Sequence, residues 1–293
     1  MYFLIWSLLF FPGGTDDSKV EFKASELAKG LWMLEGVGGF TGGNLGLLVG
    51  PDGVILIDDS MPPFSEEMLA AIRQHTDKDI SFVINTHVHA DHTGNNENLQ
   101  KQGATIVAHD NIRARMLKEG VPGPDDKMVP APKDALPVLT FADGITFHFN
   151  GQEAQVIHVA KAHTDGDAII FFKQANVIHT GDILFNGLFP FIDLDAGGTV
   201  AGYIAAQEKI LTLANDQTRI IPGHGPLAHK QELQASLDML KECDRRIADR
   251  VKAGKTQAEI LAENPLSDFH DTWNWGFITT ERMTKTLIRE HQP

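Results

Sequence analysis

The sequence predicts an α/β protein in which two β-sheets pack face to face and helices cover their outer sides. Short apolar runs rich in β-branched residues alternate with stretches whose apolar residues recur at helical spacing. The two halves of the chain also share one order of elements: strands, a helix, a further strand and a turn that carries histidine. With 293 residues, 42% of them hydrophobic and 22% charged, the chain can bury a full hydrophobic core.

The first half begins with three predicted strands, at 31–37, 44–50 and 54–60. A Pro-Asp-Gly turn at 51–53 predicts a hairpin, because proline presets φ and glycine accepts a positive φ. The elements expected next are a helix near 64–75, a strand at 80–86, a helix near 94–102, a strand at 105–109 and a helix that ends near 118.

The second half follows a proline-rich segment at 121–137, which we interpret as a connection between the halves. Its predicted elements are strands at 145–149 and 153–160, two strands within 167–182 that meet at 174–176, a helix at 197–214 and a strand at 218–225. The last 65 residues look helical, most clearly at 233–251, and show no second hydrophobic core. We therefore expect a single domain at 21–293 that includes a C-terminal helical segment at about 229–293.

The first eleven residues, MYFLIWSLLFF, form an apolar run that is shorter than the roughly 20 residues a membrane-spanning helix needs. No Lys or Arg precedes the run, and no small-x-small cleavage site follows it. Two interpretations stay open. Residues 1–20 are either an extension that docks on this fold or on a neighbouring subunit of a homo-oligomer, or a vestigial export signal. Stable membrane insertion is not expected, and the location stays open between cytoplasm and periplasm.

Charge and cysteine content limit the possible partners. The formal net charge of −14 argues against nucleic acid, because phosphate binding needs a basic surface. The single cysteine, Cys243, excludes an intramolecular disulfide and a zinc site built from paired thiolates. Any bound metal must therefore be held by histidine and carboxylate.

A cluster of metal-binding residue types follows the predicted strand at 80–86, within the segment NTHVHADHTGN. The cluster consists of His87, His89, Asp91 and His92. Histidines two residues apart at the end of an extended chain point to the same side, and the other two residues lie where the chain turns into the next helix. Imidazole and carboxylate are ligands that zinc accepts. Three imidazoles crowded at the end of a buried strand have no packing role, so a metal site is favoured.

Three further candidates, His163, Asp182 and His224, each follow an apolar strand and lie beside a glycine. Taken singly, each is as easily a turn former, and Asp91 or Thr93 alone could cap the helix near residue 94. Only their joint occurrence with the cluster favours a shared metal site. The other histidines are expected to be structural or surface residues, the last of them holding a metal ligand in place: His75, His109, His148, His158, His229, His270, His291 and His179.

The segment NTHVHADHTGN resembles the His-x-His-x-Asp-His signature of the metallo-β-lactamase superfamily. The later candidates occur in the order of that family, so the resemblance covers about residues 30–228. It implies the four-layered αβ/βα fold with two zinc ions at one edge of the sandwich. The implied ligands are His87, His89 and His163 for the first zinc, Asp91, His92 and His224 for the second, and Asp182 as a bridge between them.

Differences from individual branches narrow this resemblance. In family β-lactamases with a cysteine ligand, cysteine stands at the position of Asp182, whereas Cys243 lies in a predicted helix far beyond it. An aspartate in a Thr-Gly-Asp turn is similar to glyoxalase II, lactonases and alkylsulfatases. The basic substrate-binding segment of glyoxalase II is not apparent in ILFNGLFPFIDLDAGG, which disfavours glutathione thioesters. The flavodiiron branch has Glu at the position of His89, so zinc is favoured over an iron redox centre.

The predicted activity is hydrolysis by a metal-bound hydroxide, which two zinc ions supply at neutral pH. Asp91 is expected to be catalytic, orienting this hydroxide and carrying a proton. The substrate is expected to be a small molecule with an amide or ester-type bond, and β-lactam hydrolysis is a plausible main or side activity. The alternative is a thioesterase or lactonase of the glyoxalase II-like branch. An iron redox protein and a nuclease are less favoured.

Substrate selection is expected to depend on two apolar segments. The glycine-rich loop at 35–44 carries one aromatic residue, Phe40, and can move over a bound ligand. A second group either forms an apolar wall beside the metals or fills the core, and both interpretations stay open: Phe185, Leu188, Phe189 and Phe191. An apolar wall with few cations suits an uncharged or hydrophobic acyl compound.

Overall fold

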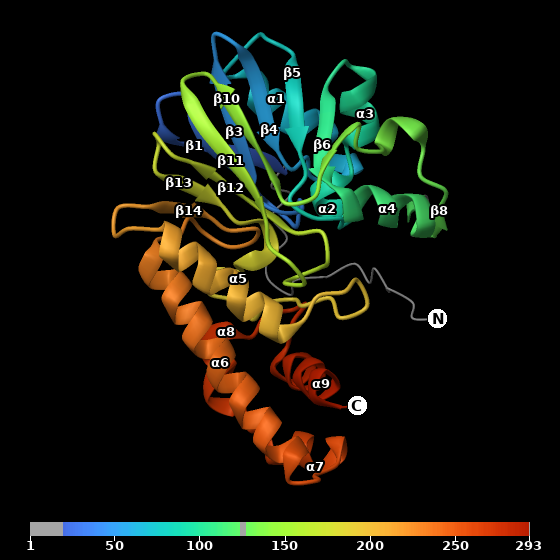
Figure 1. Cartoon of the computed structure of the whole chain (residues 1–293), viewed down its shortest axis with the longest axis vertical. Coiled ribbons are helices and arrows are strands. Elements are labelled where there is room, and N and C mark those ends of the chain that lie inside the picture. Colours follow the sequence, from blue (N-terminus) through green and yellow to red (C-terminus); the bar gives the residue numbers. More distant parts are fainter. Residues whose placement is uncertain (1–19, 124–126, 293) are drawn as a thin grey trace.

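The computed structural model describes residues 20–123 and 127–292. Two β-sheets pack face to face, and helices cover the outer side of each (Figure 1). The predicted four-layered α/β fold is therefore confirmed. The predicted N-terminal extension lies outside the described residues except for its last one, so its role and the domain boundary at 21 stay predictions.

The larger sheet has seven strands in the order β1-β2-β3-β4-β5-β6-β9, antiparallel up to β4 and parallel beyond it. The predicted hairpin at 51–53 joins β3 to β4, and Gly53 has a φ of 142°. The first strand was not predicted, since only two of its residues, Phe22 and Leu27, are buried. The strands are β1 (Glu21–Ala28), β2 (Leu31–Val37), β3 (Leu45–Gly50), β4 (Gly53–Ile57), β5 (Ile80–Ile84), β6 (Thr105–His109) and β9 (Leu139–Phe141).

The smaller sheet has five strands in sequence order, antiparallel except for the parallel pair β13 and β14. All five agree with the predicted strands. They are β10 (Gly144–Phe149), β11 (Gln152–His158), β12 (Ala168–Phe172), β13 (Val177–His179) and β14 (Arg219–Ile221). The proline-rich connection adds a short hairpin of β7 (Val121–Pro122) and β8 (Met128–Val129).

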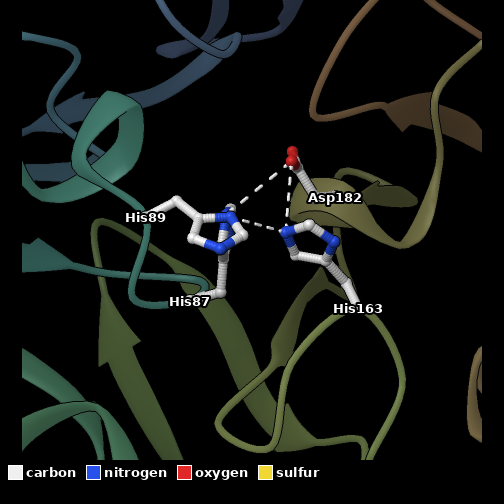
Figure 2. Close-up of side chains that lie close together, drawn as sticks. All are labelled: His87, His89, His163 and Asp182. Carbon is white, nitrogen blue, oxygen red and sulfur yellow. Dashed lines mark hydrogen bonds and ion pairs between the residues drawn. The ribbon is translucent and has the colours of Figure 1, made fainter. Parts of the chain in front are cut away.

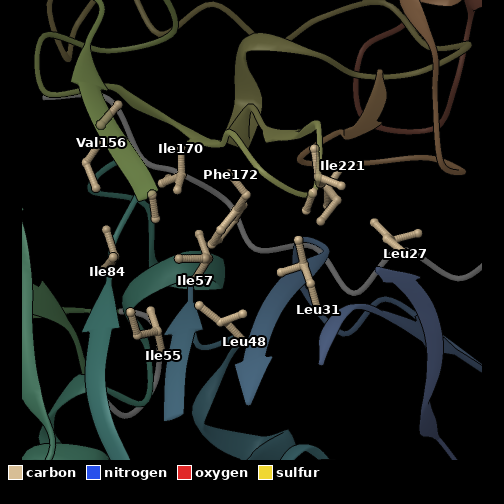
Figure 3. Close-up of a cluster of buried hydrophobic side chains, with 14 of the residues drawn as sticks. Leu27, Leu31, Leu48, Ile55, Ile57, Ile84, Val156, Ile170, Phe172 and Ile221 are labelled. Atoms are coloured by element: carbon tan, nitrogen blue, oxygen red, sulfur yellow. The ribbon is translucent and has the colours of Figure 1, made fainter. Parts of the chain in front are cut away.

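A hydrophobic core fills the space between the two sheets (Figure 3). The strand β4 shows how the layers arise, because its side chains alternate between two apolar environments. Ile55 and Ile57 face the other sheet, whereas Val54 and Leu56 lie in the cluster beneath the outer helices. All four are buried, as expected for a strand that is covered on both faces.

Helices complete the outer layers. The larger sheet carries α1 (Ser65–Arg73) and α3 (Asn96–Lys101), and the smaller sheet carries α5 (Val200–Leu213) and the start of α6 (Lys230–Lys252). The remaining helices are α2 (Ala90–Thr93), α4 (Asp110–Glu119), α7 (Gln257–Glu263), α8 (His270–Trp273) and α9 (Thr280–His291), with 3-10 turns at Pro62–Phe64, Lys133–Ala135, Gly181–Ile183 and Ser267–Phe269.

The helix predicted near 94–102 is divided and begins earlier than expected. The short helix α2 starts at Ala90, and α3 starts only at Asn96. Between them, the amide of Gly94 donates to the carbonyl of Ser60, and the amide of Asn95 donates to Asp59 Oδ1 at 2.9 Å. These bonds to the loop after β4 replace helical hydrogen bonds and cause the break.

The C-terminal helices differ from the expectation of a segment without a core. Residues from α6, α7 and α9 form a buried hydrophobic cluster together with α5 and the stretch at 189–200. In Figure 1, α5, α6, α8 and α9 gather at one end of the sandwich. Among the residues that the structure describes, no helix is long and apolar enough to cross a membrane.

Candidate metal centre

The structure brings all seven predicted residues together at one edge of the sandwich. Four turns and the short helix α2 contribute them, and each turn follows a strand of one of the two sheets. The seven residues form three overlapping groups in which the nitrogen and oxygen atoms all lie within 4.8 Å of one another: His87 with His89, His163 and Asp182; His87 with Asp91 and His92; and His92 with Asp182 and His224. Such a convergence is what a dinuclear centre requires.

The first group comes from both sheets. Figure 2 shows His87 and His89 facing His163, with the Asp182 carboxylate beside them. His163 Nε2 lies 2.9 Å from His89 Nδ1 and 3.4 Å from Asp182 Oδ2, and His87 Nε2 lies 3.7 Å from the same oxygen. Four potential ligand atoms thus surround one point.

The second group lies on the other side of the same carboxylate. Asp182 Oδ1 is 3.2 Å from His92 Nε2 and 3.5 Å from His224 Nε2. Asp91 Oδ2 is 3.5 Å and 3.4 Å from these two nitrogen atoms. One oxygen of Asp182 therefore faces the first group and the other faces the second.

Glycine permits the close approach of two loops to this centre. A Cβ atom on Gly43 would lie 2.2 Å from Cε1 of His92, and a Cβ atom on Gly223 would lie 2.0 Å from Oδ1 of Asp182. The side-chain amide of Asn44 ties the loops together, since it donates to the carbonyls of Pro222 and Gly225 at 2.9 and 2.8 Å. The glycine-rich loop is thus fastened at its C-terminal end.

The polar atoms at the centre fit a bound cation. Nε2 of His87, Nε2 of His92 and Oδ1 of Asp182 are buried without a hydrogen-bond partner among the described residues. Burying such an atom unpaired costs about 1–3 kcal/mol. A metal ion coordinated by these atoms removes that cost, and imidazole with carboxylate is a set of ligands that suits zinc.

The pKa values at the centre also favour bound positive charge. Burial raises the pKa of Asp182, but His224, His92 and His87 outweigh this effect and hold the pKa well below its ordinary value. Burial lowers the pKa of His224, yet Asp182 and Asp91 outweigh it and raise the value to about 9. Burial dominates at His163 and lowers its pKa to about 4, so this imidazole is neutral and can donate its lone pair.

Sequence reasoning missed two carboxylates that orient the histidines. Asp58 Oδ2 lies 2.7 Å from His92 Nδ1, and the amide and hydroxyl of Thr86 donate to Asp58 at 2.7 and 2.8 Å. Asp193 Oδ2 lies 3.0 Å from His89 Nε2. Each carboxylate binds one ring nitrogen and leaves the other facing the centre. An Asp pair at the end of the predicted strand 54–60 was the available signal for Asp58.

The structure also answers the question of helix capping. The N-cap of α2 is His89 and that of α3 is Asn95, so neither Asp91 nor Thr93 caps the helix.

His179 lies behind the centre, where burial lowers its pKa to about 4, and its Nε2 is 3.2 Å from the carbonyl of Asn44. It therefore supports the fastened glycine-rich loop, and its Nδ1 accepts a hydrogen bond at 3.2 Å from the amide of Gly181, the residue before Asp182. 

Aromatic side chains line the centre, and the two interpretations of the apolar segment each hold for part of it. Phe189 is fully buried in the C-terminal cluster. In contrast, Phe185 stacks on His224 at 4.9 Å, and Phe191 stacks on His89 at 5.6 Å between ring centroids. Phe40, with 41% of its surface exposed, stacks on His224 at 5.8 Å. Leu188 is only half-buried.

The chain matches a model of the metallo-β-lactamase superfamily over residues 38–236, which include all seven clustered residues. It belongs to the metallo-β-lactamase superfamily. Metallo-β-lactamase type 2 from Bacillus cereus is 24% identical over 223 residues, covering 74% of this chain and 82% of that protein. Hydroxyacylglutathione hydrolase from Brucella ovis is 28% identical over 206 residues, covering 66% and 70%.

Solved structures share the fold of the chain as well. A metallo-β-lactamase from Pontibacter korlensis has a TM-score of 0.60 at 19% identity, covering 75% of this chain and 99% of that one. A sec-alkylsulfatase from Pseudomonas sp. has a TM-score of 0.71 at 18% identity, covering 92% and 50%. The predicted family and the predicted class of enzyme are confirmed: the protein is a metallo-β-lactamase superfamily hydrolase with a candidate metal-binding cluster of His and Asp.

Proposed function

We propose that this protein is a dinuclear zinc-dependent hydrolase that cleaves an amide or ester-type bond of a small molecule, with β-lactam hydrolysis as a main or side activity. The observation that carries the proposal is the position of Asp182, whose two carboxylate oxygens face two different groups of histidines. A single metal ion would contact only one of these two groups.

The proposed ligands are the seven clustered residues. His87, His89 and His163 would hold one zinc ion, Asp91, His92 and His224 would hold the other, and Asp182 would be a ligand available to both. When bound, two zinc ions supply a water molecule of lowered pKa and polarise the carbonyl group of the substrate.

Asp91 is the proposed catalytic residue. Burial raises its pKa, but His92 and His224 outweigh this effect and hold the pKa well below its ordinary value, so the carboxylate is ionised. With 17% of its side chain exposed, Asp91 is more accessible than the buried Asp182. An ionised, accessible carboxylate can orient the attacking water and accept a proton at its oxygen.

Other residues keep the ligands in place during this step. The carboxylates of Asp58 and Asp193 accept hydrogen bonds from the N–H groups of His92 and His89, and the carbonyl of Phe191 lies 2.7 Å from His163 Nδ1. Fixing one nitrogen of each imidazole determines the tautomer and leaves the lone pair of the other toward the centre.

A thioesterase is the second candidate, and one comparison favours it. The relatives at 28% identity are hydroxyacylglutathione hydrolases, which act on thioesters by their name. Lactone hydrolysis uses the same attack on a carbonyl and belongs with this alternative. An iron redox protein remains the least favoured, because His89 stands where the flavodiiron branch has Glu.

The test is metal analysis of the purified protein together with hydrolysis assays on a β-lactam, a lactone and a thioester. We expect about two zinc ions per chain and turnover that a chelator abolishes. Asp182→Ala should lose both metal and turnover, whereas Asp216→Ala, which removes an exposed carboxylate far from the centre, should lose neither. Iron in place of zinc, or full zinc occupancy without hydrolysis of any of the three compounds, would overturn the proposal.

A further inference from the structure

A segment beyond the family match packs beside the metal centre. The matched region ends at residue 236, but the segment at 273–277 lies against the loop that follows Asp182. The amide of Phe189 donates to the carbonyl of Trp273 at 2.7 Å, and the indole of Trp275 donates back to the carbonyl of Phe189 at 2.9 Å. Two hydrogen bonds thus fix this C-terminal segment beside the centre.

Aromatic contacts extend from this segment to the candidate ligands. The ring of Trp275 lies 5.9 Å from Phe185 and 6.4 Å from His224. The ring of Phe277 lies 5.3 Å from Phe191, which itself stacks on His89. We call Phe185, Phe191, Trp275 and Phe277 the aromatic wall. Half of it comes from residues that lie outside the matched region.

One cation is inserted into the aromatic wall. Arg282, in the first turn of α9, places its guanidinium carbon 4.1 Å from the ring centroid of Phe277 and 5.3 Å from that of Phe191. Its Nη1 donates to the carbonyl of Phe277 at 3.0 Å, which fixes the side chain in this position. Arginine stays charged in proteins, and a guanidinium held between rings keeps its remaining N–H groups available at its edge.

No carboxylate in the described part of the chain forms an ion pair with Arg282. The negative charge of Asp193 raises the pKa of Arg282, but both oxygens of that carboxylate already have hydrogen-bond partners. One oxygen contacts His89, and the other accepts from the amides of Asp195 and Ala196. Burial lowers the pKa of Arg282, and the charge of Asp193 offsets this effect only in part.

We propose that Arg282 binds a carboxylate of the substrate, while an apolar part of the same molecule packs on the aromatic wall. The inference rests on the proposed hydrolase function and adds the substrate class to it. It also changes the expectation from sequence, because the wall is not free of cations and therefore suits an anionic amphiphile better than an uncharged compound. A carboxylate accepts two parallel hydrogen bonds from a guanidinium, a geometry that an ester or amide cannot reproduce.

Hydrolysis of a matched pair of substrates tests the proposal. The pair is a chromogenic cephalosporin with a free carboxylate and the methyl ester of the same compound, or 4-acetoxybenzoate and its methyl ester if β-lactams are not cleaved. In Arg282→Met, kcat/KM for the carboxylate should fall by about 10- to 100-fold through KM, the range expected for a charged hydrogen bond. The methyl ester should be cleaved as before, and Arg282→Lys should recover part of the loss.

The control is Lys285→Met, which removes a charge from the same helix at an exposed position where the lysine pairs with Glu281. Both substrates should be unaffected there. An equal fall in kcat/KM for both members of the pair in Arg282→Met, as a folding defect would cause, would overturn the assignment of Arg282. Equal activity on both members in every variant would overturn it as well.

A binding measurement separates this inference from the hydrolytic function. Addition of 3-phenylpropionate to the zinc-loaded protein should change its tryptophan fluorescence, and 3-phenylpropanamide should do so only at much higher concentration. Trp275→Phe should remove the signal, and Arg282→Met should remove the preference for the acid. Preferential binding without hydrolysis would sink the proposed function but keep Arg282 as a carboxylate site. Hydrolysis without preferential binding would sink the carboxylate site alone.

Discussion

The metal centre is assembled from turns that directly follow strands, whereas the aromatic wall is assembled from segments that lie far apart in the sequence. Buried strands on both sheets aim His87, Asp182 and His224 at one point, and glycines allow the loops to close tightly around it. The wall depends instead on Trp275 and Arg282, which pack against a loop about ninety residues earlier. In the function that we propose, the centre determines the chemistry and the wall selects the substrate.

Gly43→Ala should have the largest effect on metal content and activity, because it damages the centre. It leaves the wall intact. The new Cβ atom would overlap the ring of His92, which must move away from the other ligands. We expect the loss of one metal ion and a fall in kcat/KM of at least about 100-fold. The matched control is Gly39→Ala in the same loop, where a Cβ atom meets only Val20 at 3.5 Å. Equal metal content in the two variants would contradict the tight fit described for the centre.

Asp58→Asn should have a smaller effect on the centre. The amide can still accept from Thr86, but it no longer presents a charge to the proton on His92 Nδ1. Zinc affinity should fall by about 10- to 100-fold, as measured by competition with a chromogenic chelator. Asp59→Asn is the control, since burial raises the pKa of Asp59 well above its ordinary value and an amide resembles the protonated acid. If both variants bind zinc equally well, Asp58 does not hold His92 in place.

Trp275→Ala should have the smallest effect and should act on the wall alone. Without this ring, the adjacent faces of Phe185 and His224 are open to water. The indole forms no hydrogen bond with a proposed ligand, since its N–H donates to the carbonyl of Phe189. We expect KM to rise by about 10-fold, while kcat and zinc content stay unchanged. Steady-state kinetics with parallel metal analysis separates these quantities. A loss of zinc in this variant would show that the wall and the centre are not independent.

The seven clustered residues could be predicted from the sequence through their places after apolar strands, their joint occurrence and the family resemblance. Each of them lies in the turn or short helix that follows a strand, so the apolar run before it marks its place in the fold. The same reasoning located the strands of the smaller sheet, where buried runs are continuous. It missed β1, whose exposed charged residues hide the two that are buried.

Contacts between distant segments could not be predicted from one sequence. Asp193 lies 104 residues from His89, and nothing in its surroundings marks it as a partner of a histidine. Arg282 lies in an amphipathic stretch that predicts a helix correctly but not its neighbours. For the same reason, the C-terminal helices looked like a segment without a core, because their buried cluster is shared with α5 and the loop before it.

Anomalous diffraction at the zinc absorption edge tests the central claim most directly. Crystals of the zinc-loaded protein should show two peaks, one among His87, His89 and His163 and one among Asp91, His92 and His224, with Asp182 between them. A single peak, or two peaks of which one lies away from Asp182, would contradict the dinuclear centre on which the account depends.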